Sequence, residues 1–304
     1  MYKSNAKALK LWYFKSDKQK TKQSFCMFNY NKLACSLKRK IYSFSKKNSN
    51  GLKRPKYKFI CHMLYGLAES QSVHLSNISR ALKKTIERLS KNLNCFNENE
   101  IVMENYTQTI SEYIDNHTIF PIDLSDVLKP CSYTLEALGK VHDGSKDKIE
   151  KGYNMFEIAA LTREFKMPMP VYTRIYSNAE REFISQDEEA LKGFKYLTKH
   201  YGRRGIRTLD RGYDGNTYYK YFMKNREKFV IRSKINRHVI FYGKRINILE
   251  LANKYKGKYK MKFKDKKGKT IHCKISYIPI SLPLAPKKAL TLAVVYGFGE
   301  NLCF

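Results

Sequence analysis

Between residues 117 and 232 the apolar side chains switch repeatedly between a period of two residues and a helical period. This switching constrains the fold more than any other feature of the chain. In chain order it predicts three strands, a helix, a strand, a helix and a final strand, over 118–123, 152–161, 169–177, 186–200, 205–209, 216–225 and 229–232. The pattern therefore predicts a mixed α/β domain over 113–235.

The order of these elements is that of an RNase H-like domain, in which three consecutive strands precede an alternation of helices and strands. We therefore expect an RNase H-like mixed sheet with flanking helices. A helical region is expected before it, and a basic, β-rich insertion after it.

Residues 236–286 form the expected insertion. From 254 to 266 every second residue is lysine, so a strand here would carry ammonium groups on one face and Tyr, Met and Phe on the other. Such a strand suits a sheet edge that lysines protect from aggregation, and it also suits a phosphate backbone. We expect DNA contacts from Lys258, Lys260 and Lys262. The apolar run over 289–296 is expected to be the last core strand, within a final segment 287–304.

Before the α/β domain, three apolar stripes at helical spacing predict a helical DNA-binding region over 55–112, behind a basic and partly disordered segment over 1–54. The polar sides of the last two helices carry Arg80, Lys83, Lys84, Arg88 and Lys91. A helix-turn-helix unit and a basic amphipathic hairpin explain this pattern equally well, because no glycine marks a turn. Arg80 and Arg88 are the DNA-contact candidates.

The formal net charge is +32, from 59 Lys and Arg against 27 Asp and Glu. This charge excludes an acidic solvating protein and favours a polyanionic partner. No run of about 18 apolar residues predicts a membrane span. The seven cysteines are scattered without a CxxC pair, which argues against a disulfide framework or zinc site and for a reducing cytoplasm.

Two acids stand at the ends of predicted strands: Asp123 in IDLSD (122–126) and Asp210 in LDRG (209–212). Carboxylates that converge from separate strand ends can hold Mg²⁺ ions for phosphoryl transfer. Most strand-end aspartates instead cap loops or helices. Asp126 competes with Asp123 for such a role, and Asp214 competes with Asp210.

Several segments resemble, in the same order, bacterial insertion-sequence transposases of the DDE type, a group with an RNase H-like catalytic domain. They are SQSVHLSNISRAL (70–82), IDLSD (122–126), LGKVHDGSKDKIEKGY (138–153), IYSNAEREFIS (175–185) and LDRGYDGNTYYKYFMKNREKFVIRSK (209–234). The resemblance covers roughly 55–300, and the last of these segments is the most specific.

The resemblance implies that Asp123 and Asp210 are catalytic and bind Mg²⁺ or Mn²⁺, and that Arg211, Arg232 and Lys234 face phosphates. It also implies double-stranded DNA as partner, as terminal inverted repeats and target DNA. A homodimer and a cytoplasmic, nucleoid-associated location go with it.

The family's third acid is a glutamate on a helix after the last core strand, within a Tyr–Arg–Glu–Lys pattern, and it has no match here. Glu250 precedes the last apolar run, and Glu300 follows it too closely. We therefore expect a C-terminally truncated transposase that cuts DNA poorly or not at all.

The alternative is a non-catalytic DNA-binding remnant that represses transposition. An RNA-binding protein would also explain the charge and the 23 tyrosines, but it would not require paired strand-end acids.

Overall fold

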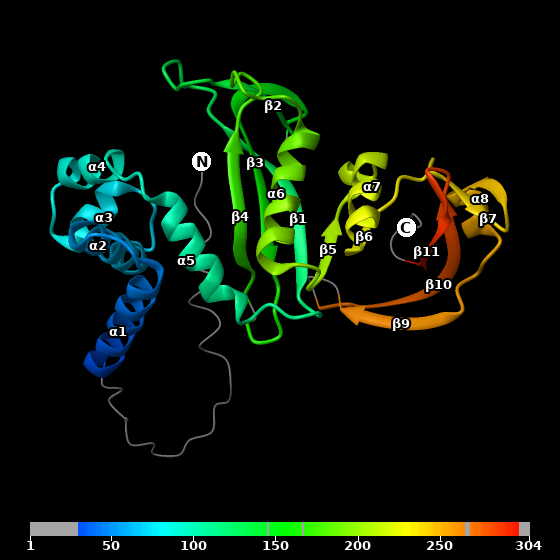
Figure 1. Ribbon diagram of the computed structural model, residues 1–304, viewed down its shortest axis with the longest axis horizontal. Coiled ribbons are helices and arrows are strands. Elements are labelled where there is room, and N and C mark those ends of the chain that lie inside the picture. Colours follow the sequence, from blue (N-terminus) through cyan, green and yellow to red (C-terminus); the bar gives the residue numbers. More distant parts are fainter. Residues whose placement is uncertain (1–29, 145, 166, 265–267, 298–304) are drawn as a thin grey trace, which may run out of the picture. The chain divides into compact units, whose positions relative to one another are not determined.

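Figure 1 shows a computed structural model of the chain, which describes residues 30–144, 146–165, 167–264 and 268–297. Close backbone contacts divide the chain into two units, 1–102 and 103–304, and each is described by itself. Residues 1–29 of the expected basic segment lie outside the described residues. The rest of that segment includes a helix, α1 (Tyr30–Asn48).

The first unit is helical. After α1 come α2 (Arg54–Ser70), α3 (Leu75–Leu82) and α4 (Ile86–Asn94), and a further helix, α5 (Asn99–Ser111), begins at its end. Proline in the first turn of α2 suits a position where no N–H is needed. The Thr85 side chain accepts a hydrogen bond from the Arg88 N–H and so caps α4.

A short turn joins α3 to α4. Lys83 takes a left-handed backbone conformation there, with φ of 51°, in place of the glycine that the sequence lacks. A Cβ on Gly66 of α2 would lie 2.7 Å from Ile78 Cγ2, so glycine allows α2 and α3 to approach closely. Two helices joined by a short turn beside a third suit both a helix-turn-helix unit and a basic amphipathic hairpin.

The first sheet of the second unit consists of β1 (Ile119–Leu128), β2 (Gly139–Asp143), β3 (Lys148–Ala160), β4 (Met169–Tyr176), β5 (Ile206–Leu209) and β6 (Lys228–Ile231). β3 pairs antiparallel with β1, β2 and β4. β5 is parallel to both β1 and β6. The order β4-β3-β1-β5-β6 is that of an RNase H-like sheet, and it confirms the predicted mixed α/β fold.

Two helices connect the strands of this sheet: α6 (Gln186–Tyr201) leads from β4 to β5, and α7 (Asn216–Asn225) leads from β5 to β6. The Ser185 side chain caps α6 by accepting the Glu188 N–H at 3.2 Å. Phe194 of α6 and Phe222 of α7 are fully buried, with ring centroids 5.0 Å apart. Ile110 of α5 also belongs to this core, so the unit begins earlier than the expected 113.

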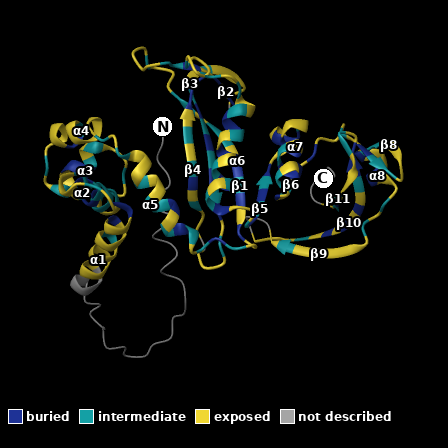
Figure 2. Cartoon of the chain, in the orientation of Figure 1, coloured by how far each residue is buried: buried dark blue, intermediate teal, exposed yellow. Residues whose placement is uncertain are grey.

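The second sheet covers the expected insertion and extends past its end at 286, because its last strand reaches Tyr296. It contains β7 (His238–Phe241), β8 (Lys244–Asn247), β9 (Tyr259–Lys264), β10 (Thr270–Leu282) and β11 (Ala285–Tyr296), with α8 (Ile248–Asn253) after β8. The strand order is β11-β10-β7-β8, and β9 pairs with β10. Figure 2 shows that β9 is exposed along most of its length.

The strand expected over 289–296 exists, but it does not close the first sheet. It is part of β11, which pairs antiparallel with β10 from Lys274–Tyr296 to Leu282–Ala285. The short connection between β10 and β11 makes them a hairpin. An apolar run predicts that a strand is buried, but it does not predict which strand pairs with it. The last strand of the first sheet is β6. No helix in the described ranges is long and apolar enough to cross a membrane.

Candidate metal and nucleic-acid site

The two predicted acids lie close together on the first sheet, but only Asp210 directly follows a strand. Asp123 lies within β1, which continues to Leu128 and does not end at 123 as expected. The parallel register of β1 and β5 aligns Ile122 with Leu209, the residues immediately before Asp123 and Asp210. On the other side of β5, the register with β6 aligns Leu209 with Ile231, the residue before Arg232. Asp123, Asp210 and Arg232 therefore occupy equivalent positions on three adjacent strands.

Asp123 and Asp210 line one cavity of about 270 Å³. Its other lining residues come mainly from β1, α6 and the segment after β5: Leu124, Phe156, Tyr176, Gln186, Asp187, Gly212, Tyr213 and Tyr218. Each predicted acid accepts one backbone N–H through Oδ1 at 2.9 Å, from Leu124 and Gly212 respectively. Within the described part of the chain neither acid forms an ion pair, so each keeps an oxygen for an external ligand.

The turn after β5 holds Asp210 in place. Asp210 is the N-cap of a short 3₁₀ helix, η1 (Arg211–Tyr213). A Cβ on Gly212 would lie 3.0 Å from Asp210 Oδ1, so glycine leaves room for the carboxylate. Burial, reinforced by the negative charges of Asp123 and Asp210, raises the pKa of Tyr213. Its phenol therefore stays protonated at neutral pH and adds no further charge to the cavity.

A third carboxylate, Asp187, lines the same cavity from the first turn of α6. The Tyr218 hydroxyl donates to Asp187 Oδ1 at 2.6 Å, and burial together with this hydrogen bond raises the pKa of Tyr218. Burial also raises the pKa of Tyr176 to about 12. Sequence reasoning missed Asp187, because acids are ordinary in a first helical turn.

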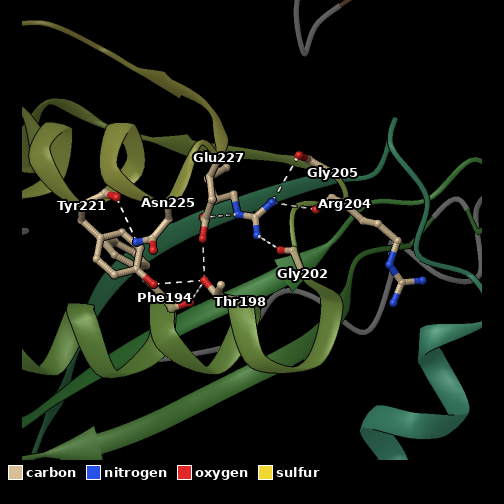
Figure 3. Close-up of polar contacts among 9 residues, drawn as sticks. Phe194, Thr198, Gly202, Arg204, Gly205, Tyr221, Asn225 and Glu227 are labelled. Atoms are coloured by element: carbon tan, nitrogen blue, oxygen red, sulfur yellow. Dashed lines mark hydrogen bonds and ion pairs between the residues drawn. The ribbon is translucent and has the colours of Figure 1, made fainter.

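A buried ion pair anchors the strand that carries Asp210 (Figure 3). Arg207 of β5 and Glu227 before β6 are both fully buried, and Nε lies 2.9 Å from Oε2. Arg207 also donates to the backbone carbonyls of Gly202 and Arg204, at 2.8 and 2.6 Å. The Thr198 hydroxyl of α6 donates to Glu227. The pair thus joins the end of α6, β5 and the segment after α7.

Desolvation opposes the charged forms of this pair. Burial lowers the pKa of Arg207 and raises the pKa of Glu227. The surrounding hydrogen bonds are needed to offset that cost.

The two competing aspartates are separated from the cavity. Asp126 does not line it, and burial raises the pKa of Asp126. Asp214 is buried and forms an ion pair with Arg237 at 2.5 Å, and it also accepts hydrogen bonds from the Tyr219 hydroxyl and the Lys234 backbone N–H. Asp214 does not cap α7, whose N-cap is Gly215.

One lysine of β9 faces another lysine across the sheet, and a second faces a histidine. Lys260 lies directly opposite Lys274 of β10, and Lys262 lies opposite His272. Like charges at directly opposed positions are unfavourable unless an anion compensates them. No ion pair in the described ranges involves these lysines, which favours an external anion.

The other predicted DNA contacts are mostly exposed. Arg211 follows Asp210 in η1, and Lys234 follows β6. Lys258 directly precedes β9, and its backbone N–H donates to Ile275. Arg80 and Arg88 are exposed on α3 and α4 in the first unit. None of these positions is shown to contact nucleic acid.

The donor set suits a weakly held divalent cation. In the described residues no group of three or more His, Cys, Asp or Glu side chains is arranged to hold a metal. Two carboxylates with spare oxygens suit Mg²⁺ or Mn²⁺, which retain much of their hydration. Glu250 lies in the first turn of α8, in the second-sheet region, and Glu300 lies outside the described residues.

No protein-family model matches this sequence, and no curated protein matches it. Among solved structures, the chain is similar to the piggyBac transposase in a synaptic complex with hairpin DNA, at 11% identity and a TM-score of 0.37. That match covers 92% of this chain and 63% of the piggyBac chain, so this chain spans less than two thirds of its length.

A second match is the Mos1 transposase in its strand transfer complex, at 11% identity, a TM-score of 0.23 and coverage of 54% and 55% of the two chains. A third is endonuclease V of Ciona intestinalis bound to inosine-containing DNA, at 10% identity, a TM-score of 0.25 and coverage of 66% and 83%. These scores are too low to transfer a function, which must come from the chain's own residues.

Proposed function

We propose that this chain is a DNA-binding protein of the transposase type, in which Asp123 and Asp210 form the metal-binding site for DNA strand cleavage and transfer. The alignment of Asp123, Asp210 and Arg232 at equivalent register positions along three adjacent strands supports this proposal. The Asp123 and Asp210 carboxylates line a cavity that Asp187 also lines, and Arg232 occupies the equivalent register position on the next strand. Within a chain of charge +32, this arrangement suits a phosphodiester better than a neutral substrate.

The proposed mechanism assigns a role to each side of the cavity. Asp123 and Asp210 provide oxygen ligands for Mg²⁺ or Mn²⁺. When bound, such an ion would neutralise charge on the scissile phosphate and acidify a water or hydroxyl nucleophile. Arg232, at the equivalent position on β6, provides a cation for the phosphate backbone of the DNA strand. The phenol of Tyr213, which also lines the cavity, stays protonated and neutral. The negative charge in the cavity therefore comes from its carboxylates.

The DNA itself would lie along cationic surfaces beyond the cavity. Lys258, Lys260 and Lys262 would follow a phosphate backbone along β9, and the position of Lys274 of β10 opposite Lys260 supports this role. Arg80 and Arg88 would contact DNA from the helix-turn-helix unit. We further propose that the chain comes from an insertion sequence and that its DNA substrates are terminal inverted repeats and target DNA. It would act as a homodimer on nucleoid DNA.

A second function has its own support. In the described ranges no third carboxylate completes a metal cluster with Asp123 and Asp210, although metal-dependent strand transfer needs a firmly positioned ion. A DNA-binding protein that occupies element ends without cutting them, and so represses transposition, is therefore the alternative.

DNA binding and cleavage, measured in parallel, distinguish these functions. Fluorescence anisotropy would follow binding to duplexes that carry the element's terminal repeats, and gel analysis would follow Mg²⁺- or Mn²⁺-dependent cleavage. We expect Asp123→Asn and Asp210→Asn to reduce cleavage by about 100-fold or more while binding changes by less than about threefold.

Asp126→Asn is the matched control, because it removes a carboxylate from the same strand outside the cavity. It should cut as well as the native chain. Equal cleavage by native, Asp123→Asn and Asp210→Asn proteins would show that the site is elsewhere. Tight binding without cleavage by the native chain, with either metal, would establish the repressor alternative.

A further inference from the structure

A second polar cavity, of about 390 Å³, lies where α7 begins and the second sheet approaches it. Its lining includes Asn216 at the start of α7, Lys234 and Arg237 after β6, and Arg245 of β8. His238 and Asn236 add two more polar side chains. Neither the Asp123–Asp210 cavity nor the cationic face of β9 includes these residues.

The charges in this cavity do not balance. Lys234, Arg237 and Arg245 are three permanent cations, and Asp214 is the one carboxylate in the lining. Arg237 already satisfies Asp214 through an ion pair at 2.5 Å, and it donates to the Asp214 backbone carbonyl at 2.7 Å. The side chains of Lys234 and Arg245 have no carboxylate partner among the residues the structure describes. Two cations therefore remain for an external anion.

The backbone at the start of α7 also favours an anion in this cavity. Gly215 caps α7 and has no side chain with which to accept the first N–H groups of the helix. The ion pair between buried Asp214 and partly buried Arg237 fixes this end of α7 against the segment after β6, so the lining is held in place. A helix N-terminus next to uncompensated cations is a favourable place for a phosphate.

The cavity is close to the acid pair along the chain. Asp210 lines the first cavity, and Asp214, Gly215 and Asn216 line the second. Six residues span at most about 21 Å, even when fully extended. At about 3.4 Å per nucleotide along a strand, that distance corresponds to roughly six nucleotides or fewer.

We propose that this cavity binds one backbone phosphate of a nucleic-acid strand that also passes the Asp123–Asp210 cavity. This proposal rests on the proposed DNA-binding function and adds a specific strand-positioning site to it. Arg245 and Lys234 supply the charge, Asn216 and the first turn of α7 supply N–H donors, and Arg237 holds the wall.

The test is the salt dependence of DNA binding by Arg245→Gln, measured by anisotropy with a labelled duplex. Loss of one phosphate contact should weaken binding roughly tenfold at low salt and reduce the slope of log K against log salt by about 0.9. Lys234→Gln should do the same. Arg245 is exposed and forms no ion pair in the described part of the chain, so the unfolding temperature should not change.

Lys244→Gln is the matched control, since it removes one charge from the neighbouring position of β8 and does not line the cavity. Its affinity should change by less than about twofold. If Lys244→Gln and Arg245→Gln reduce the affinity and the slope equally, the cavity is not a phosphate site, although DNA binding stands.

A parallel titration with inorganic phosphate, at constant ionic strength, separates the two possible sources of the phosphate group. DNA binding by the native chain that depends on Arg245 supports the proposal. If the native chain binds no DNA, the proposed function fails. In that case, stabilisation by inorganic phosphate that Arg245→Gln abolishes would show a site for a free phosphate and overturn the strand assignment.

Discussion

Gly212 determines how much room the Asp210 carboxylate has. The two residues share one turn, in which the Gly212 N–H donates to Asp210 Oδ1 at 2.9 Å. A Cβ at position 212 would lie 3.0 Å from that same oxygen, closer than ordinary van der Waals contact. A single methyl group can therefore move one metal ligand without removing it.

At this scale we predict that Gly212→Ala lowers Mg²⁺-dependent cleavage by about tenfold, because a displaced carboxylate positions the ion poorly. If the chain does not cut, Mg²⁺ affinity is the quantity to measure. The free energy of unfolding should fall by less than about 1 kcal/mol, since the turn is exposed. Gly144→Ala is the control, because its Cβ would meet nothing within 4 Å. An unaffected Gly212→Ala enzyme would mean that Asp210 does not act through this oxygen.

Between elements, the Arg207–Glu227 pair adds a polar anchor to a short central strand whose Leu209 packs in the apolar core. β5 has only four residues, yet it carries the turn with Asp210 and lies between β1 and β6. Its fully buried arginine reaches three backbone carbonyls after α6 as well as Glu227. The strand is thereby tied to both crossover helices.

We predict that Arg207→Met and Glu227→Met each destabilise the protein by about 3–5 kcal/mol, because each leaves the other charge buried and unpaired. The double variant should lose less than the sum of the single variants, by about 2–3 kcal/mol. Urea denaturation of the three variants measures this coupling. Strict additivity would show that the two side chains do not stabilise each other.

For the whole molecule, the distribution of positive charge predicts how the chain binds DNA. Among the described strands β9 pairs with β10, and it carries Lys260 opposite Lys274 and Lys262 opposite His272, so it gains most from a polyanion. We predict that the Lys260→Gln, Lys262→Gln double variant reduces the salt slope of DNA binding by about 1–2 without lowering the unfolding temperature.

The corresponding double arginine variant preserves both charges and should keep the native slope. Anisotropy titrations at several salt concentrations provide the measurement. An unchanged slope in the glutamine variant would leave β9 as a protected edge strand without a DNA contact.

Local patterns predicted much of the second unit. The helical repeat placed α7 at its observed bounds, 216–225, and the apolar runs located β4 and β5 to within one residue at each end. β11 shows where this reasoning fails. Its apolar run correctly predicted a strand, but pairing with β10 was decided by the hairpin and not by the residues of the run. The Lys83 turn was likewise missed, because lysine carries no turn signal.

By itself, the sequence determined much of the succession of strands and helices, the position of Asp210 directly after a strand, and the excess of positive charge. These follow from side-chain periodicity and composition, which are local properties of a chain. The tertiary structure decided which groups meet: Asp123 with Asp210 on one cavity, Asp214 in a buried pair with Arg237, and Lys234 with Arg245 beside the start of α7. Strand register and the helical crossover connections determine these contacts, because they bring together residues that are distant in sequence and share no local pattern.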